Sequence, residues 1–211
     1  MVLGRHDRRR VRPAGALPVR ASAAHFEDGT LDYLNIPAVE IGLRLLERIG
    51  IETIHTRVGA LVDGLIESLG SLRHSDGAPA AVIYGPISSQ HRGATVAFNF
   101  LHPDGRVVDE RYVDRIAAQR GVSLRTGCFC NPGAGEIAFT ISHETLVGGE
   151  FGEGMTLDDY VRTIGLPSGG AVRASLGIAS NFADAYRFAD FAARFVDLGD
   201  LPDDLPPRTV C

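Results

Sequence analysis

Apolar residues recur at helical spacing in two consecutive segments of the first third of the chain. The first run begins at Asn35-Ile-Pro37, where Asn can cap a helix and Pro is tolerated in the first turn, and it ends at Gly50. The second run covers residues 54–69 and is followed by a turn at 74–77. The apolar positions of the two runs are Ile36, Val39, Leu43 and Leu46, then Ile54, Val58, Leu61, Leu65 and Leu69. This spacing predicts two long amphipathic helices.

Shorter segments alternate between apolar and polar positions, which is typical of strands. Residues 95–101 are the clearest case, with Val96, Phe98 and Phe100 on one face, and Pro103-Asp-Gly105 then predicts a hairpin turn. Further strands are expected at 81–84, 122–124 and 171–178, and shorter helices near 112–120, 157–164 and 181–196. The order of these elements predicts an α+β fold with a small, mostly antiparallel sheet and flanking helices.

The two ends of the chain differ in composition from the rest. Residues 1–24 carry six Arg against one acid, Asp7, and show no helical or strand period. We interpret them as a basic disordered leader; a transit peptide and a basic arm for an acidic partner are the alternatives. The tail, residues 198–211, is acidic and rich in Pro and is expected to be loose. The ordered region is therefore predicted to span residues 25–197.

Composition narrows the classes of function. The formal net charge of −5 argues against a nucleic-acid surface, and no apolar run approaches the roughly 20 residues that a membrane span needs. Three cysteines, Cys128, Cys130 and Cys211, are too few and too badly spaced for a disulfide framework, which favours a reducing, cytoplasmic compartment. All 21 basic residues are Arg. Without Lys, the chain has no residue for an internal Schiff base or a P-loop.

The segment Arg125-Thr-Gly-Cys-Phe-Cys-Asn-Pro-Gly133 is the clearest candidate for chemistry. It places two thiols one residue apart after a predicted strand, in a Gly- and Pro-rich loop that leaves backbone N–H groups available. Free amides and a cation such as Arg125 both favour the thiolate, the nucleophilic form of Cys. Packing in the core is the alternative for either Cys. A metal site is not expected, because only His143 lies nearby and zinc needs about four ligands.

Two further segments are candidates for binding anions. Arg173 lies in Ala171-Val-Arg-Ala-Ser-Leu176 among small and apolar residues, where a buried guanidinium needs an anionic partner. The alternative for Arg173 is an edge position with its head group in water. Phe26-Glu-Asp-Gly-Thr30 places Gly and Thr before a helix, a pattern that can offer N–H and hydroxyl donors to a phosphate. Taken alone, this last pattern also fits an ordinary turn.

Together these segments resemble a known family. Phe26-Glu-Asp-Gly-Thr30, Arg125-Thr-Gly-Cys-Phe-Cys130 and Val172-Arg-Ala-Ser-Leu-Gly177 occur in the order and spacing of the C-terminal half of class V aminotransferase-fold enzymes. The sequence is most similar to cysteine desulfurases and, among them, to the desulfurase-like domain of molybdenum cofactor sulfurases. The resemblance covers about residues 25–197. It implies the small C-terminal domain of a fold-type I enzyme that depends on pyridoxal phosphate.

The resemblance also implies roles for individual residues. Cys130 matches the thiol that attacks the substrate sulfur and becomes a persulfide, and Arg173 matches the Arg that binds the substrate carboxylate. Arg125 matches an Arg that supports the active-site loop, and we place it with the substrate-binding residues. Gly29 and Thr30 match residues that contact the phosphate of pyridoxal phosphate held mainly by the other subunit of a dimer.

The chain also departs from the family pattern. The family's pyridoxal phosphate lysine lies in a large domain before the Phe26–Thr30 segment, which here begins at residue 26, so we expect that domain to be absent and the chain alone to be inactive. Cys128 has no universal counterpart. The apolar stripes of the two long helices are expected to pack on a second copy of the chain or on a separate lysine-bearing chain. A small-molecule sulfur substrate is expected. The alternatives are a non-enzymatic sulfur carrier and an inactive remnant.

Overall fold

The computed structural model describes residues 30–129, 132–142, 144, 156–202, 204–205 and 207–208. The chain divides into two compact units, Met1–Thr53 and Ile54–Cys211. The first contains helix α1, and the second contains the sheet and the helices that pack on it. Within the described ranges, no helix is both long enough and apolar enough to cross a membrane.

Helix α1, Ile36–Ile49, begins and ends where the sequence predicts, and Gly50 follows its last turn. Asn35 precedes the helix, but its amide donates to Asp32 Oδ2 at 2.7 Å instead of capping the first turn. No residue of α1 is buried. Its exposed large apolar side chains are Ile36, Val39, Ile41, Leu43 and Leu45. The apolar stripe is therefore uncovered within the described part of its own unit.

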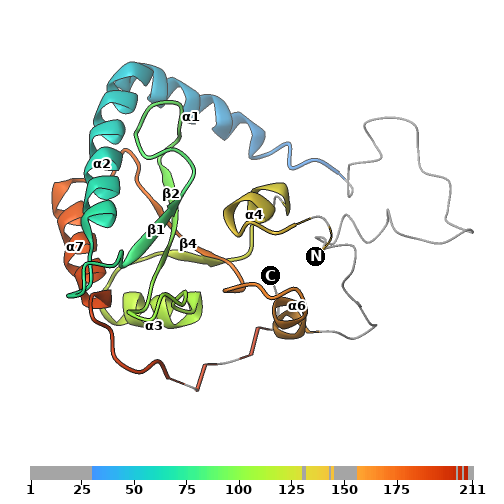
Figure 1. Ribbon diagram of the computed structural model, residues 1–211. Coiled ribbons are helices and arrows are strands. Elements are labelled where there is room, and N and C mark those ends of the chain that lie inside the picture. Colours follow the sequence, from blue (N-terminus) through green and yellow to red (C-terminus); the bar gives the residue numbers. More distant parts are fainter. Residues whose placement is uncertain are drawn as a thin grey trace, which may run out of the picture. The chain divides into compact units, whose positions relative to one another are not determined.

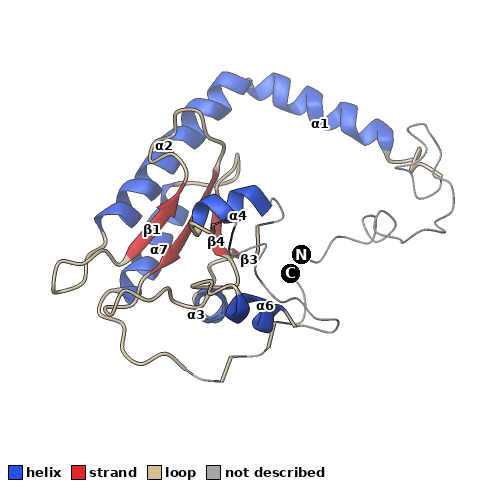
Figure 2. Ribbon diagram, turned by 45° about the vertical axis from the view of Figure 1, so that its right-hand side comes forward, coloured by secondary structure: helices blue, strands red, loops and turns tan. Residues whose placement is uncertain are grey.

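Four antiparallel strands form one sheet in the second unit (Figure 1). The strands are β1, Ala81–Tyr84, β2, Thr95–Phe100, β3, Arg125–Gly127, and β4, Ala171–Ser175. Their order in the sheet is β1-β2-β4-β3, so the last strand in the sequence lies between β2 and β3 (Figure 2). The predicted small antiparallel sheet is confirmed, and with its helices the unit is α+β.

Helices lie on both sides of this sheet. Those that bury the core are α2, Ile51–Ser71, α3, Glu110–Gln119, and α7, Phe182–Ala192, which continues into the 3₁₀ turn Ala193–Phe195. The short helix α4, Pro132–Ala138, lies on the opposite side of the sheet from α2 and α7 (Figure 1). Helix α6, Leu157–Thr163, follows it in the chain. At the start of α7, the Asn181 side chain accepts from two backbone N–H groups and so caps the helix.

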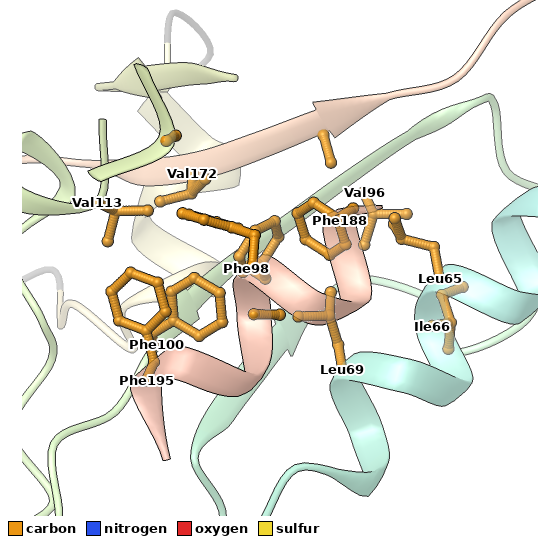
Figure 3. Close-up of a cluster of buried hydrophobic side chains, with 14 of the residues drawn as sticks. Leu65, Ile66, Leu69, Val96, Phe98, Phe100, Val113, Val172, Phe188 and Phe195 are labelled. Carbon is orange, nitrogen blue, oxygen red and sulfur yellow. The ribbon is translucent and has the colours of Figure 1, made fainter. Parts of the chain in front are cut away.

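The core contains the residues that the alternating and helical patterns placed on apolar faces. Figure 3 shows Phe98 and Phe100 of β2 beside Phe188 of α7 and Leu69 of α2. Phe100 stacks on Phe195, with ring centroids 3.9 Å apart and an interplanar angle of 3°. The stripe of α2 is thus covered by this chain itself. The expectation that both helical stripes need a partner is wrong for α2, whereas the stripe of α1 has no cover among the described residues of its own unit.

Three local differences separate the structure from the predicted elements. β3 begins at Arg125 instead of Val122, because the backbone partners of β3 on β4 start there, while Val122 and Leu124 pack against the core from the preceding loop. β4 ends at Ser175 instead of residue 178. The segment expected to be a Gly- and Pro-rich loop turns into α4 at Pro132.

The described residues of the tail make polar contacts with other parts of the second unit. Just before the tail, Asp197 Oδ1 accepts from the backbone N–H of Ser75 at 2.8 Å. Further along, Asp204 pairs with Arg115 of α3 at 3.1 Å, and Arg208 is bound by several carboxylates. The acidic residues of this region are thus partners for Arg and Ser groups elsewhere in the fold.

Candidate functional site

The two candidate arginines are direct neighbours across two strands. Arg125 of β3 pairs in register with Arg173 of β4, and residues directly opposite in an antiparallel pair carry their side chains on the same face. Val172 and Ala174 belong to the core, so Arg173 and Arg125 lie on the other face. We call this surface of the sheet the arginine face. Ala97 of β2 is the other neighbour of Arg173.

Neither guanidinium has a hydrogen bond or ion pair within the described part of the chain. Arg173 is half-buried and Arg125 is exposed. Two like charges directly opposite each other on a sheet repel, and a partly buried cation without a partner loses hydration. An anion bound between the two side chains relieves both costs, and guanidinium groups match the two oxygens of a carboxylate. The arginine pair is therefore a candidate carboxylate-binding site.

Strand β3 leads directly into the cysteine segment. Gly127, its last residue, has a φ of 115°, a conformation that residues with side chains rarely adopt. Cys128 follows; it is half-buried and disulfide-bonded, although the three cysteines argued against a disulfide framework. Cys130 lies outside the described residues. The strand that carries Arg125 is thus the strand that brings the chain to the cysteines.

Phe129, between the two cysteines, belongs to an aromatic cluster on the arginine face. Its ring centroid lies 6.2 Å from that of Tyr84 on β1 and 5.8 Å from that of Phe139, which follows α4. Tyr84 and Phe139 are 5.6 Å apart, and all three contacts are edge-to-face. Burial raises the pKa of Tyr84 to about 12. The cluster anchors the middle of the cysteine segment. The cluster was not predicted from the sequence, although an aromatic residue between two cysteines was an available clue.

A close backbone approach holds the start of the cysteine segment. A Cβ atom on Gly170, the residue before β4, would lie 2.0 Å from the carbonyl C and O of Gly127 and 2.6 Å from the backbone N of Cys128. Real side chains do not approach so closely, so this position requires glycine. Asn99 is fully buried, and its Nδ2 donates to Gly170 O at 3.2 Å. Nothing in the local sequence distinguishes Gly170 from the other glycines of the chain.

The structure does not place the two remaining candidate residues, Gly29 and Thr30, relative to this site. Gly29 lies outside the described residues, and Thr30 is exposed in the unit Met1–Thr53. Among the residues that the structure describes, no group of His, Cys, Asp and Glu is arranged to hold a metal ion. The candidate site therefore consists of residues of the second unit: the arginine pair, the aromatic cluster and the start of the cysteine segment.

A cavity of about 200 Å³ is separate from this site. Its lining includes Leu65, Ala174 and Phe188, which belong to the core on the other face of the sheet. The cavity therefore does not connect the arginine pair to the cysteine segment.

Comparison with protein families identifies the chain. The model of the aminotransferase class-V family matches residues 9–188. The chain belongs to this family. The matched range begins inside the segment 1–24, so the similarity reaches further toward the N-terminus than the three sequence motifs indicate. Membership of this family implies pyridoxal phosphate as the cofactor.

Molybdenum cofactor sulfurases are among the relatives of the chain. It is 36% identical to the one from Solanum lycopersicum over 186 residues, which are 88% of this chain and 22% of the relative. It is 38% identical to the one from Arabidopsis thaliana over 170 residues, 79% of this chain and 21% of the relative. The chain thus spans about a fifth of the length of these curated relatives.

Two solved cysteine desulfurases have a similar fold. The apo enzyme from Thermococcus onnurineus NA1 superposes with a TM-score of 0.53 at 19% identity and covers 87% of this chain and 36% of its own. CsdA from Escherichia coli gives a TM-score of 0.51 at 15% identity, with 80% of this chain and 32% of its own covered. At these identities the likeness is one of fold.

The residues of this chain do not fit covalent attachment of pyridoxal phosphate. The cofactor's aldehyde bonds to a lysine amine, and all 21 basic residues here are Arg. Guanidinium groups stay protonated at neutral pH and bind anions instead. The guanidinium groups of the arginine face are thus suited to binding an anion such as a carboxylate and not to covalent attachment of the cofactor.

Proposed function

We propose that this chain forms the sulfur-accepting and carboxylate-binding part of an active site of the cysteine desulfurase or molybdenum cofactor sulfurase type. In this role it acts as the small C-terminal domain of a fold-type I enzyme, beside a lysine-bearing large domain. The register of Arg125 with Arg173, on the strand that leads into the cysteines, carries the proposal. It supports the proposal because the arginine pair has no hydrogen bond or ion pair among the described residues, and β3 leads into the segment that contains Cys130.

Each site residue has a defined task in this proposal. Arg173, supported by Arg125, binds the carboxylate of a small sulfur-containing substrate. The thiolate of Cys130 attacks the sulfane sulfur of a persulfide donor. The new bond joins Cys130 Sγ to that sulfur, the donor's S–S bond breaks, and the donor leaves as a thiolate with the electron pair. Gly29 and Thr30 would hold the phosphate of pyridoxal phosphate bound mainly by a second subunit.

A second candidate function is a non-enzymatic sulfur carrier. It needs only an accepting thiol and a group that orients the donor, tasks that Cys130 and Arg173 would perform. Such a carrier takes sulfur from a separate cytoplasmic enzyme, whereas an inactive remnant takes none. A lysine-bearing class V gene next to this one would favour an enzyme encoded by two genes over the sulfur carrier.

Sulfur acceptance by the reduced chain tests the proposal. With cysteine persulfide as donor, we expect mass spectrometry to find one added sulfur at Cys130, which Cys130→Ser removes and Cys128→Ser and Cys211→Ser retain. Arg173→Ala is expected to slow the transfer roughly tenfold, the order of a lost hydrogen bond between charged groups. The matched donor is cysteamine persulfide, which lacks the carboxylate.

With that donor, Arg173→Ala is expected to react at the rate of the unmodified chain. Two results would refute the proposal: sulfur added first at Cys211, or an equal effect of Arg173→Ala on both donors.

The uncovered stripe of α1 predicts association of the chain with a second copy of itself. Burying apolar surface stabilises association by about 25 cal/mol per Å², and Val39 and Leu43 of the stripe are exposed on this helix. Sedimentation velocity is expected to show dimers that dissociate on dilution, and Val39→Glu with Leu43→Glu is expected to abolish them. Ile137→Glu on α4, which is also exposed, is the matched control. A stable monomer at tens of micromolar would count against the partner surface.

A further inference from the structure

Arg208 joins the tail to the first turns of two helices. Its Nε donates to Glu110 Oε1, its Nη2 to Asp109 Oδ2 and its backbone N–H to Asp158 Oδ2, each at 2.8 Å. Asp109 caps α3, Glu110 is the first residue of α3, and Asp158 lies in the first turn of α6. The Arg208 side chain is only 9% exposed. The proposed function assigns no role to this buried ion-pair cluster.

Glu110 depends on Arg208 for charge compensation. Its side chain is 3% exposed, and its carboxylate accepts from Arg208 and from the hydroxyl of Ser168. A buried carboxylate without a counter-charge is strongly unfavourable. Burial acts to lower the pKa of Arg208, but the hydrogen bonds to Glu110 outweigh it and raise that pKa, so the guanidinium stays charged. Without Arg208, the surroundings of Glu110 must open to hydrate it.

Those surroundings reach the cysteine segment through Ser168, Gly169 and Gly170. Ser168, which donates to Glu110, also accepts from Gly170 N at 3.4 Å. A Cβ atom on Gly169 would lie 2.2 Å from Arg208 Nε, and one on Gly170 would lie 2.0 Å from Gly127 O. The 168–170 segment is therefore in contact with Arg208 at one residue and with the start of the cysteine segment at the next.

We propose that Arg208 is a positioning residue for the cysteine segment. By compensating Glu110, it holds residues 168–170 against Gly127 and so determines the backbone position from which the cysteines follow. The inference rests on the proposed function for its consequence, the rate of sulfur transfer. The positioning itself is a property of the chain and is measured without any sulfur donor.

Amide hydrogen exchange of the reduced full-length chain tests this inference. In Arg208→Ala, exchange of residues 125–129 is expected to become roughly tenfold faster, the order expected for lost hydrogen bonds to a charged group, while exchange in α2 and α7 stays unchanged. Guanidinium ion at concentrations far below those that denature is expected to bind between the carboxylates and slow the exchange again. Arg115→Ala is the matched control, since it removes the ion pair of the tail with Asp204 away from residues 168–170.

Unchanged exchange at 125–129, or exchange that becomes faster by the same factor throughout the unit, would overturn the inference. If Arg208→Ala does not fold, Ser168→Ala provides the test, because it keeps the Arg208–Glu110 ion pair and removes the hydroxyl that connects Glu110 to Gly170. It is expected to produce the same local increase, and no increase would likewise overturn the inference. A chain that shows the local increase but accepts no sulfur would refute the proposed function alone.

Discussion

Replacing Phe100 by alanine is expected to lower the free energy of unfolding by about 3–5 kcal/mol. Phe100 is fully buried, stacks on Phe195 and makes edge contacts with Phe98 at 5.2 Å and with Phe191 at 6.1 Å between ring centroids. These rings come from β2, α7 and the 3₁₀ turn, so they cannot all move into the space left by the missing side chain. The loss is a large share of the stability of a domain of this size.

Urea unfolding followed by circular dichroism under reducing conditions measures this effect. Phe182→Ala is the matched control, because the Phe182 side chain is 71% exposed, and its effect is expected to stay within about 0.5 kcal/mol. The slope of the unfolding free energy against urea concentration, the m value, is expected to remain unchanged for both variants. A loss below about 1 kcal/mol for Phe100→Ala, a typical value for ordinary substitutions, would contradict the packing of this core.

Elements with long, regular spacing could be predicted from the sequence. In α2 and β2, the apolar face that produces the pattern is the face that packs in the core, so pattern and burial agree. The same spacing predicted α1 equally well, although its stripe is uncovered. Periodicity indicates which face of an element is apolar and does not indicate what covers it.

The errors arise where contacts between distant segments decide the local structure. The bounds of β3 follow from its pairing with β4, and no local feature of residues 122–127 reports that pairing. The partner of Asp204, Arg115 on α3, likewise lies far from it in the sequence. Helix α4 was missed for another reason: its two glycines and its proline favour loops when only local preference is considered.

The candidate site was predictable in part. Arg173 was a candidate because a charged residue in an apolar strand needs a partner. The cysteines were candidates because they lie one residue apart in a Gly- and Pro-rich loop. Their connection was not predictable from pattern, since it depends on the register that places Arg125 opposite Arg173. The resemblance to the family was carried by three short motifs in the right order and not by the periodicity of apolar residues. Gly170 could not be found at all, because its importance lies in atoms of Gly127 and Cys128.

Gly170→Ala is expected to displace the start of the cysteine segment and to destabilise the chain by about 1–3 kcal/mol, the usual cost of overpacking. The added Cβ would meet backbone atoms of Gly127 at 2.0 Å. Backbone atoms cannot rotate away as the end of a side chain can, so either β3 or the start of β4 must move. Movement of β3 also disturbs the register of Arg125 with Arg173.

Gly177→Ala is the matched control for this variant. Gly177 follows the same strand, and a Cβ atom there meets nothing within 4 Å. Both substitutions restrict the unfolded chain equally, an effect worth about 0.4–1 kcal/mol in favour of the folded state. The difference between the two variants in urea unfolding therefore isolates the contact with Gly127. Because the clash is local, amide exchange at residues 125–129 is expected to be faster in Gly170→Ala than in Gly177→Ala. Equal stability and equal exchange in the two variants would show that the close approach of Gly170 does not hold the cysteine segment.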